Sequence, residues 1–144
     1  FSPNKAMVGA TIDGTDGYRG AGYAYPVLVG MESTDADLAY NMTKAMVELF
    51  DGYSGNAPGI NGWALDKQDM TWVAPYHEGA IRYFEEVGMW SDEAQAHNDN
   101  LIARQAALKA AWDELKAENP ENWDEAWAEK RREALREGGF QVVF

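Results

Sequence analysis

A short helix with well-defined ends is the feature that most constrains the fold of this chain. Pro75 has no backbone N–H and stops any element that precedes it, whereas Gly88 can adopt the left-handed conformation that closes a helix. The pattern between them predicts an amphipathic helix over about residues 77–87, with one face against a core. This apolar face comprises Ala80, Ile81, Phe84 and Val87.

A second amphipathic helix is predicted over residues 37–50. Ser33 or Thr34 can cap its N-terminus, and Asp35 and Asp37 lie where the helix dipole favours negative charge. Its apolar side chains recur every three or four residues, so we expect this face to be buried. The face comprises Leu38, Met42, Ala45, Met46 and Leu49.

Two strands are predicted ahead of these helices. Residues 5–12 are β-prone, and residues 23–31 are mostly apolar without alternation, which is typical of a strand buried on both faces of a sheet. Pro26 argues against a fully bonded central strand, because it lacks the N–H that the ladder needs. Residues 13–22 are rich in glycine and are predicted to form a loop. The second of these strands suggests a mixed or parallel sheet.

The chain changes character at Ser91, which can cap a long helix that we predict to end near Glu118. Leucines recur at seven-residue spacing in this helix, although the heptads are too few to predict a coiled coil. The narrow apolar stripe comprises Ala94, His97, Leu101, Leu108, Trp112 and Leu115.

A last helix is predicted to start at Asn119 and Pro120 and to end at Gly138. It carries Trp123 and Trp127 one turn apart, and we expect these side chains to pack against the body or a partner. The apolar tail, residues 140–144, is predicted to dock as a strand or against a neighbour.

The acidic balance excludes some classes of partner. The chain has 144 residues, and 24 acidic against 12 basic side chains give a net charge of −12. This charge repels phosphates and anionic lipids, so we expect no nucleic-acid partner. Cysteine is absent, which removes disulfides, thiolate nucleophiles and cysteine-ligated metals. No apolar run approaches the roughly 20 residues that cross a bilayer.

The histidines and serines do not have the spacing of a metal site or a catalytic site. His77 and His97 are the only histidines and do not have the spacing of a metal pair. We expect His77 to cap a helix or fill its junction, and His97 to pack on its helix. The serines lie in caps or loops, and none lies in a Gly-x-Ser-x-Gly turn. We predict no enzyme activity, no cofactor and no metal site.

The glycine-rich stretch suggests a candidate ligand site, because Tyr18, Tyr23 and Tyr25 lie close in sequence to the cation Arg19. A guanidinium can hold a carboxylate through two parallel hydrogen bonds, with aromatic side chains as walls. In the other interpretation these tyrosines are ordinary packing residues and Arg19 is a surface charge. If a ligand binds this chain, we expect Tyr18 and Arg19 to contact it first.

The two amphipathic helices together resemble the C-terminal region of the TAXI-type solute-binding proteins of TRAP transporters. In that family, a Tyr-x-x-Thr-Lys-Ala helix is followed by a Pro-x-His-x-Gly-Ala-x-x-Tyr-Tyr/Phe pattern. The resemblance covers about residues 10–90, whereas residues 91–144 extend beyond the usual end of the family. The matching positions are Tyr40, Thr43, Lys44, Ala45, Pro75, His77, Gly79, Ala80, Tyr83 and Phe84.

The resemblance implies a periplasmic binding protein type II-like fold, in which two α/β lobes close over a solute. We expect residues 1–90 to be part of one such α/β lobe and residues 91–144 to be a C-terminal all-helical extension. Phe1 is read as an internal start, with any export signal removed or encoded upstream. A sheet cut in this way has unpaired edges. We therefore expect a partner, either the missing N-terminal part of the same protein or a second copy in strand exchange.

The function implied by the resemblance is periplasmic capture of a small organic acid or amino-acid-like ligand. The solute is then handed to the membrane subunits of a TRAP-type secondary transporter. An alternative from another class is a helical protein-interaction or assembly module without a small-molecule ligand. In that alternative the two C-terminal helices are the working part and the first ninety residues are a platform.

Overall fold

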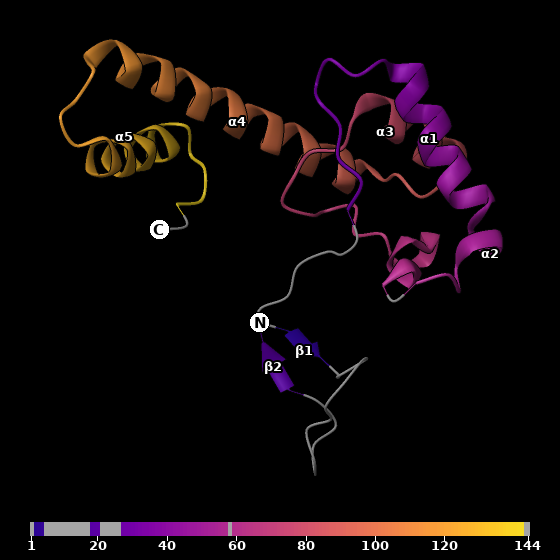
Figure 1. Ribbon diagram of the computed structural model, residues 1–144. Helices are drawn as coiled ribbons and strands as arrows, with labels where there is room; N and C mark the ends of the chain where they lie inside the picture. Colours follow the sequence, from indigo (N-terminus) through magenta and orange to yellow (C-terminus); the bar gives the residue numbers. More distant parts are fainter. Residues whose placement is uncertain (1, 5–17, 21–26, 58, 143–144) are drawn as a thin grey trace. The chain divides into compact units, whose positions relative to one another are not determined.

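The computed structural model describes residues 2–4, 18–20, 27–57 and 59–142, and gives the backbone alone for the first two ranges. Helices dominate the described residues (Figure 1). Strands β1 (Ser2–Asn4) and β2 (Tyr18–Gly20) form an antiparallel pair in which Pro3 lies opposite Arg19. The chain divides into two compact units, Phe1–Asp69 with His77–Phe84 and Met70–Tyr76 with Glu85–Phe144. We call them the first and second unit.

The predicted α/β fold is wrong. Apart from β1 and β2, the described residues contain only helices, turns and loops. The predicted strand at residues 5–12 lies outside the described residues. Of the strand predicted at residues 23–31, residues 27–31 lie in no strand, and Val29 is 81% exposed. A strand needs a neighbour for its N–H and C=O groups, and no described strand pairs with residues 27–31.

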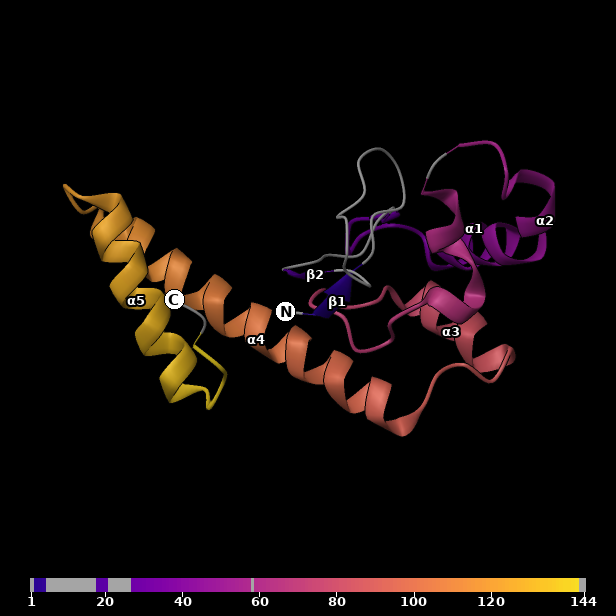
Figure 2. The same ribbon diagram turned by 90° about the horizontal axis from the view of Figure 1, so that it is seen from below.

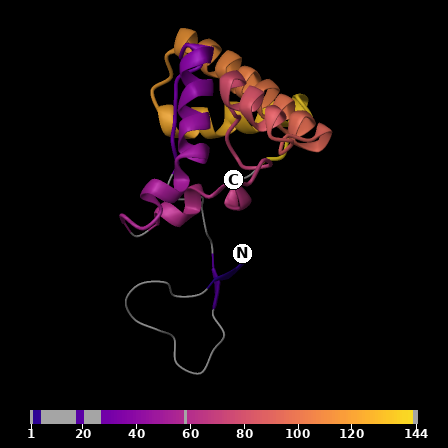
Figure 3. The same ribbon diagram turned by 90° about the vertical axis from the view of Figure 1, so that its right-hand side faces the viewer.

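The first unit contains α1 (Ala36–Glu48) and the single turn α2 (Phe50–Tyr53), which turns away at the end of α1 (Figure 3). Asp35 caps α1, because its side chain accepts a hydrogen bond from the Leu38 N–H at 2.9 Å. The Thr34 hydroxyl instead accepts from the Met31 N–H at 3.0 Å. The expectation that Ser33 or Thr34 caps this helix is therefore wrong.

The apolar face predicted to be buried on α1 is largely exposed. No residue of α1 is fully buried, and Leu38, Met42 and Leu49 are all exposed, Leu49 to 65%. The periodicity correctly predicts a helix, but it cannot show whether another element covers the apolar face. The face that does pack carries Ala39 and Tyr40.

Two 3₁₀ turns, η1 (Ile60–Trp63) and η2 (Leu65–Lys67), form the connection after α2. The Gln68 side-chain amide donates to the carbonyls of Gly62 and Ala64 at 3.1 and 2.9 Å. These two hydrogen bonds tie the end of η2 to η1.

Helix α3 (Glu78–Glu86) follows the predicted bounds closely, and Gly88 after it has a φ of 72°. Phe84 is buried as expected, but Val87 is exposed, and the most buried aromatic side chain is Tyr83 at 2% exposure. The apolar spacing did not include Tyr83, because its hydroxyl makes it ambiguous in a hydrophobic pattern.

The second unit is built on two helices, α4 (Asp92–Glu118) and α5 (Trp123–Glu137), which lie side by side (Figures 1 and 2). Ser91 caps α4 as predicted, with its hydroxyl accepting from the Ala94 N–H at 3.1 Å. None of the described helices combines the length and the apolar character that crossing a bilayer requires.

The turn between α4 and α5 differs from the prediction. Asn119 does not begin the last helix but ends α4 in the left-handed conformation, with a φ of 48°. Asn122 caps α5 instead, and its side chain accepts from the Glu125 N–H at 3.4 Å. Asparagine favours both roles, so the sequence alone could not assign them.

The core of this hairpin is small and apolar. Ala111 and Leu115 of α4 and Leu135 of α5 are buried. Trp112 packs at its edge against Trp123 and Trp127, with ring centroids 5.6 and 5.2 Å apart.

The end of α5 is closed by a paired hydrogen-bond motif. The Phe140 N–H donates to the Leu135 carbonyl and the Gly139 N–H donates to the Arg136 carbonyl, with Gly139 at a φ of 71°. The predicted end at Gly138 is thus confirmed. Residues 140–142 of the tail form no strand, and residues 143–144 lie outside the described residues.

Candidate functional site

The predicted ligand residues fall mostly where the structure gives no side chains. Tyr18 and Arg19 lie in β2, where their backbones pair with Asn4 and Pro3, and Tyr23 and Tyr25 lie outside the described residues. Their proposed convergence on a carboxylate therefore stays a prediction.

The best-defined group of polar and aromatic side chains lies between α1 and α3 in the first unit. We call Asp37, Tyr40, Lys44, Arg82 and Tyr83 the α1–α3 cluster. The guanidinium of Arg82 lies 4.2 Å from the centroid of the Tyr40 ring and 2.7 Å from the Asp37 carboxylate. The Tyr40 and Tyr83 rings meet edge to face with centroids 5.9 Å apart. Both contacts are favourable for aromatic rings.

Lys44 completes this cluster on the other side of Tyr40. Its ammonium lies 3.4 Å from the Tyr40 hydroxyl, 3.7 Å from Glu48, and 6.0 Å from the centre of the Tyr83 ring. Both cations of the cluster thus face a carboxylate as well as an aromatic ring. The side chains of Asp37 and Arg82 are 78% and 48% exposed, so their ion pair contributes little to stability by itself.

Close approach of the two helix backbones depends on Gly79. A Cβ atom at this position would lie 2.2 Å from the Ala36 carbonyl oxygen and 2.8 Å from both the Ala39 Cβ and the Tyr40 nitrogen. Real Cβ atoms do not approach other atoms so closely. Glycine is therefore required at this point, and it sets the distance at which Tyr40 and Tyr83 meet.

His77 fixes the start of α3. Its Nδ1 atom accepts a hydrogen bond from the Gly79 N–H at 3.1 Å, so this nitrogen carries no proton in the structure. The ring satisfies one of the N–H groups that a helix N-terminus leaves unpaired. The expectation that His77 caps the helix is confirmed.

Comparison with known protein families gives a match for the segment that contains the α1–α3 cluster. Residues 24–88 match the NMT1-like family. The likeness covers this segment only, which is less than half of the chain. No curated protein matched the chain, and no solved structure did. The resemblance stated from the sequence is thus supported at the level of this family, whereas nothing in the match names TAXI proteins or TRAP transporters.

The matched segment includes both helices of the α1–α3 cluster and ends at Gly88, where α3 closes. Helices α4 and α5 lie outside the match. The spaced residues on which the resemblance rested include Tyr40, Lys44, Gly79 and Tyr83, and the structure brings these four together. Sequence reasoning missed Asp37 and Arg82 as a pair, since opposite charges 45 residues apart give no periodic signal.

A second polar group lies in the second unit, where α4 holds the segment Met70–Tyr76. The His97 Nε2 atom lies 2.7 Å from the Trp72 carbonyl oxygen, and the Asn98 side chain accepts from the Tyr76 N–H at 2.7 Å. Asn98 is almost fully buried, and the Tyr76 ring packs edge to face on Trp90. These contacts satisfy the backbone of a loop, as expected for a packed His97.

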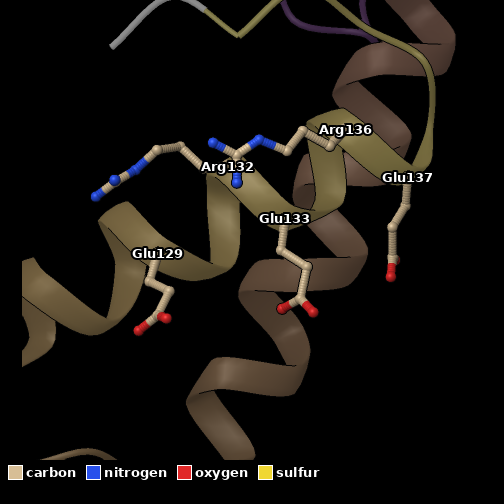
Figure 4. Close-up of a pocket in the computed structure, with 5 residues that line it drawn as sticks. All are labelled: Glu129, Arg132, Glu133, Arg136 and Glu137. Carbon is tan, nitrogen blue, oxygen red and sulfur yellow. The ribbon is translucent and has the colours of Figure 1, made fainter.

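A shallow, open depression lies on α5 (Figure 4). The carboxylates of Glu129, Glu133 and Glu137 extend to one side of the helix, and the guanidinium groups of Arg132 and Arg136 lie on the other. One helix supplies every lining side chain, and no apolar wall is present, unlike a typical small-molecule site.

Metal ligands do not cluster in the described part of the chain: no group of three histidine, aspartate or glutamate side chains there could hold an ion. Burial raises the pKa of the Tyr53 hydroxyl, which donates to the Met46 carbonyl. The α1–α3 cluster, with both cations engaged, is suited to holding two helices in register rather than to proton transfer or covalent chemistry.

Proposed function

We propose that residues 24–88, which match the NMT1-like family, are part of an exported solute-binding protein. The protein would capture a small organic acid or an amino-acid-like ligand. The observation that carries this proposal is the coincidence of the family match with the α1–α3 cluster. The spaced residues of the pattern are those that join the two helices. The residues of this pattern therefore pack α1 against α3, and we expect proteins that share the pattern to share this pair of helices.

The finer assignment follows from the sequence resemblance. We propose a TAXI-type receptor in the periplasm that delivers its solute to the membrane subunits of a TRAP-type transporter. Binding, rather than catalysis, is the proposed activity. In such receptors the solute is enclosed by two lobes, so residues 1–90 are proposed to act together with further polypeptide.

Arg19 is the proposed anchor for the carboxylate of the solute, with Tyr18 beside it and Tyr23 and Tyr25 as walls. An arginine can bind a carboxylate through two parallel, charge-assisted hydrogen bonds. Loss of such a contact costs about 1.5–3 kcal/mol, which is roughly a 10- to 150-fold loss of affinity.

Thermal-shift measurements against dicarboxylates, keto acids, amino acids and aromatic acids test this proposal. A ligand at 100 times its Kd stabilises the folded state by about 2.7 kcal/mol, which raises the Tm of a chain of this size by roughly 5–10 °C. Arg19→Ala is expected to reduce the shift to about half or less at the same ligand concentration. Arg132→Ala, the control, removes the same charge from an exposed site on α5 and should leave the shift intact.

A second candidate function is favoured by the hairpin of α4 and α5. It has its own buried residues, Leu115 and Leu135, and lies outside the family match. A module of this kind can serve protein interaction or assembly. If no compound in the panel raises the Tm of the full-length protein, this function gains support; if a compound does so and Arg19→Ala reduces the shift, solute binding is favoured.

A further inference from the structure

The two histidines of the chain make opposite kinds of hydrogen bond. The Nδ1 atom of His77 accepts a bond from the Gly79 N–H at 3.1 Å, so this nitrogen must be free of a proton. The Nε2 atom of His97 lies 2.7 Å from the Trp72 carbonyl oxygen. A carbonyl oxygen can only accept, so His97 donates this bond and its Nε2 atom carries the proton. A second proton on each ring therefore breaks the His77 bond and leaves the His97 bond in place.

The His77 bond holds a part of the first unit that has little room to move. The Gly79 N–H belongs to the first turn of α3, where a helix leaves its N–H groups without partners inside the helix. Gly79 is also buried, and α3 meets the backbone of α1 there, at Ala36 and Tyr40. The protonation state of His77 thus acts on the first turn of α3 and on the contact of α3 with α1.

The charged groups around His77 give a proton on its ring little support. No described carboxylate forms an ion pair with this ring. On α3 the neighbouring Glu78 is exposed, so water and salt weaken its attraction, and Arg82 pairs with Asp37 of α1. Residues 70–76, which precede His77, contain no aspartate, glutamate, lysine or arginine. The helix dipole also opposes a positive charge at the start of α3.

We propose that His77 is a pH-sensitive cap, which holds the first turn of α3 against α1 at neutral pH and releases it in mild acid. Histidine side chains take up their second proton near pH 6.5, so the change is expected between about pH 8 and about pH 5.5. Protons bind more readily to the form without the cap, and the stability of the first unit therefore falls as the pH falls. The cap acts whether or not a solute is bound, since it involves neither Arg19 nor the other candidate ligand residues.

The test compares wild type, His77→Asn and His97→Gln by urea denaturation at about pH 8 and about pH 5.5. Asparagine is a good helix cap, and its side-chain oxygen accepts a hydrogen bond at both pH values. Glutamine at position 97 keeps a side-chain N–H donor, and each variant loses one histidine. Relative to His77→Asn, wild type and His97→Gln should lose a further factor of roughly 2 to 30 in the folding equilibrium constant on acidification, which is the usual effect of losing a cap.

Nitrogen NMR of wild type is the second readout and covers a folding defect in either variant. At neutral pH the Nδ1 atom of His77 should carry no proton. The protection of the Gly79 amide from hydrogen exchange, corrected for the intrinsic effect of pH, should fall along the titration curve of the same ring. Any of three results overturns the proposal: a proton on Nδ1 at neutral pH, Gly79 protection that does not follow this titration, or an equal acid response of wild type and His77→Asn.

Discussion

At the scale of single residues, Gly79 carries the closest contact between α1 and α3. Helices α1 and α3 meet backbone to backbone at Gly79, so even one added methyl group must displace Ala36 or Tyr40. Overpacking of this kind costs about 1–3 kcal/mol. The cost arises from the neighbouring backbone, because Gly79 lies in a regular helix and has no need of a left-handed conformation.

Gly79→Ala is therefore expected to lower the free energy of unfolding by at least about 1 kcal/mol, measured by urea denaturation. Gly52→Ala is the control, since a Cβ atom there would have no neighbour within 4 Å and alanine favours the helix by about 0.5–1 kcal/mol. Equal midpoints for the two variants would show that α1 and α3 are farther apart than the structure places them.

Single residues also show what local sequence can predict. The cap at Ser91 and the cap at His77 were predictable, because each depends on a side chain and a backbone N–H two or three residues away. The stack of Arg82 on Tyr40 was not, because it joins residues that only the tertiary fold brings together.

At the scale of elements, the long helix α4 carries an acid-sensitive group on its outer surface. The Asp113 carboxylate lies 2.6 Å from Lys109 and 2.8 Å from Lys116. Hydrogen bonds from Lys109 and then Lys116 lower the pKa of Asp113 from 3.8 to about 2. Because the folded-state pKa is the lower one, this carboxylate stabilises the fold above about pH 4, and the contribution disappears as the pH falls through about 2.

Wild type should thus lose more stability between pH 5 and pH 2 than Asp113→Asn, as measured by denaturant midpoints at both pH values. Glu121→Gln serves as the control, because Glu121 is exposed and forms no ion pair among the described residues. Identical acid sensitivity of Asp113→Asn and wild type would rule out the two lysine contacts as a source of stability in solution.

The elements themselves were predicted unevenly. Helices α1, α3 and α4 begin and end within a few residues of the predicted bounds, although α1 is capped by Asp35 and not by Ser33 or Thr34. The burial of α1 and the strand at residues 23–31 were wrong, because each prediction assumed that another element covers the segment. Periodicity reports which side chains can be buried together, while burial depends on what the rest of the chain supplies.

At the scale of the whole molecule, the net charge of −12 sets the response to salt. Like charges repel within the folded chain, and added salt screens them over a Debye length of about 10 Å at 0.1 M. The few exposed ion pairs, such as Lys44 with Glu48, are weakened by the same screening but contribute little.

We therefore expect the Tm to rise between about 0.02 and about 0.5 M sodium chloride, as measured by differential scanning calorimetry, because the Debye length shortens several-fold over this range. A Tm that falls with salt would mean that ion pairs such as Lys130 with Glu114 and Glu118 outweigh the general repulsion.

The turn at Asn119 has a consequence for the order in which the chain acquires structure. The contact of Lys130 with Glu118 closes a loop of 12 residues, whereas that of Arg82 with Asp37 closes one of 45. The longer closure costs about 1 kcal/mol more in chain entropy, and local helical contacts form within microseconds to milliseconds. During refolding from denaturant, the C-terminal hairpin should thus assemble first and the first unit should follow.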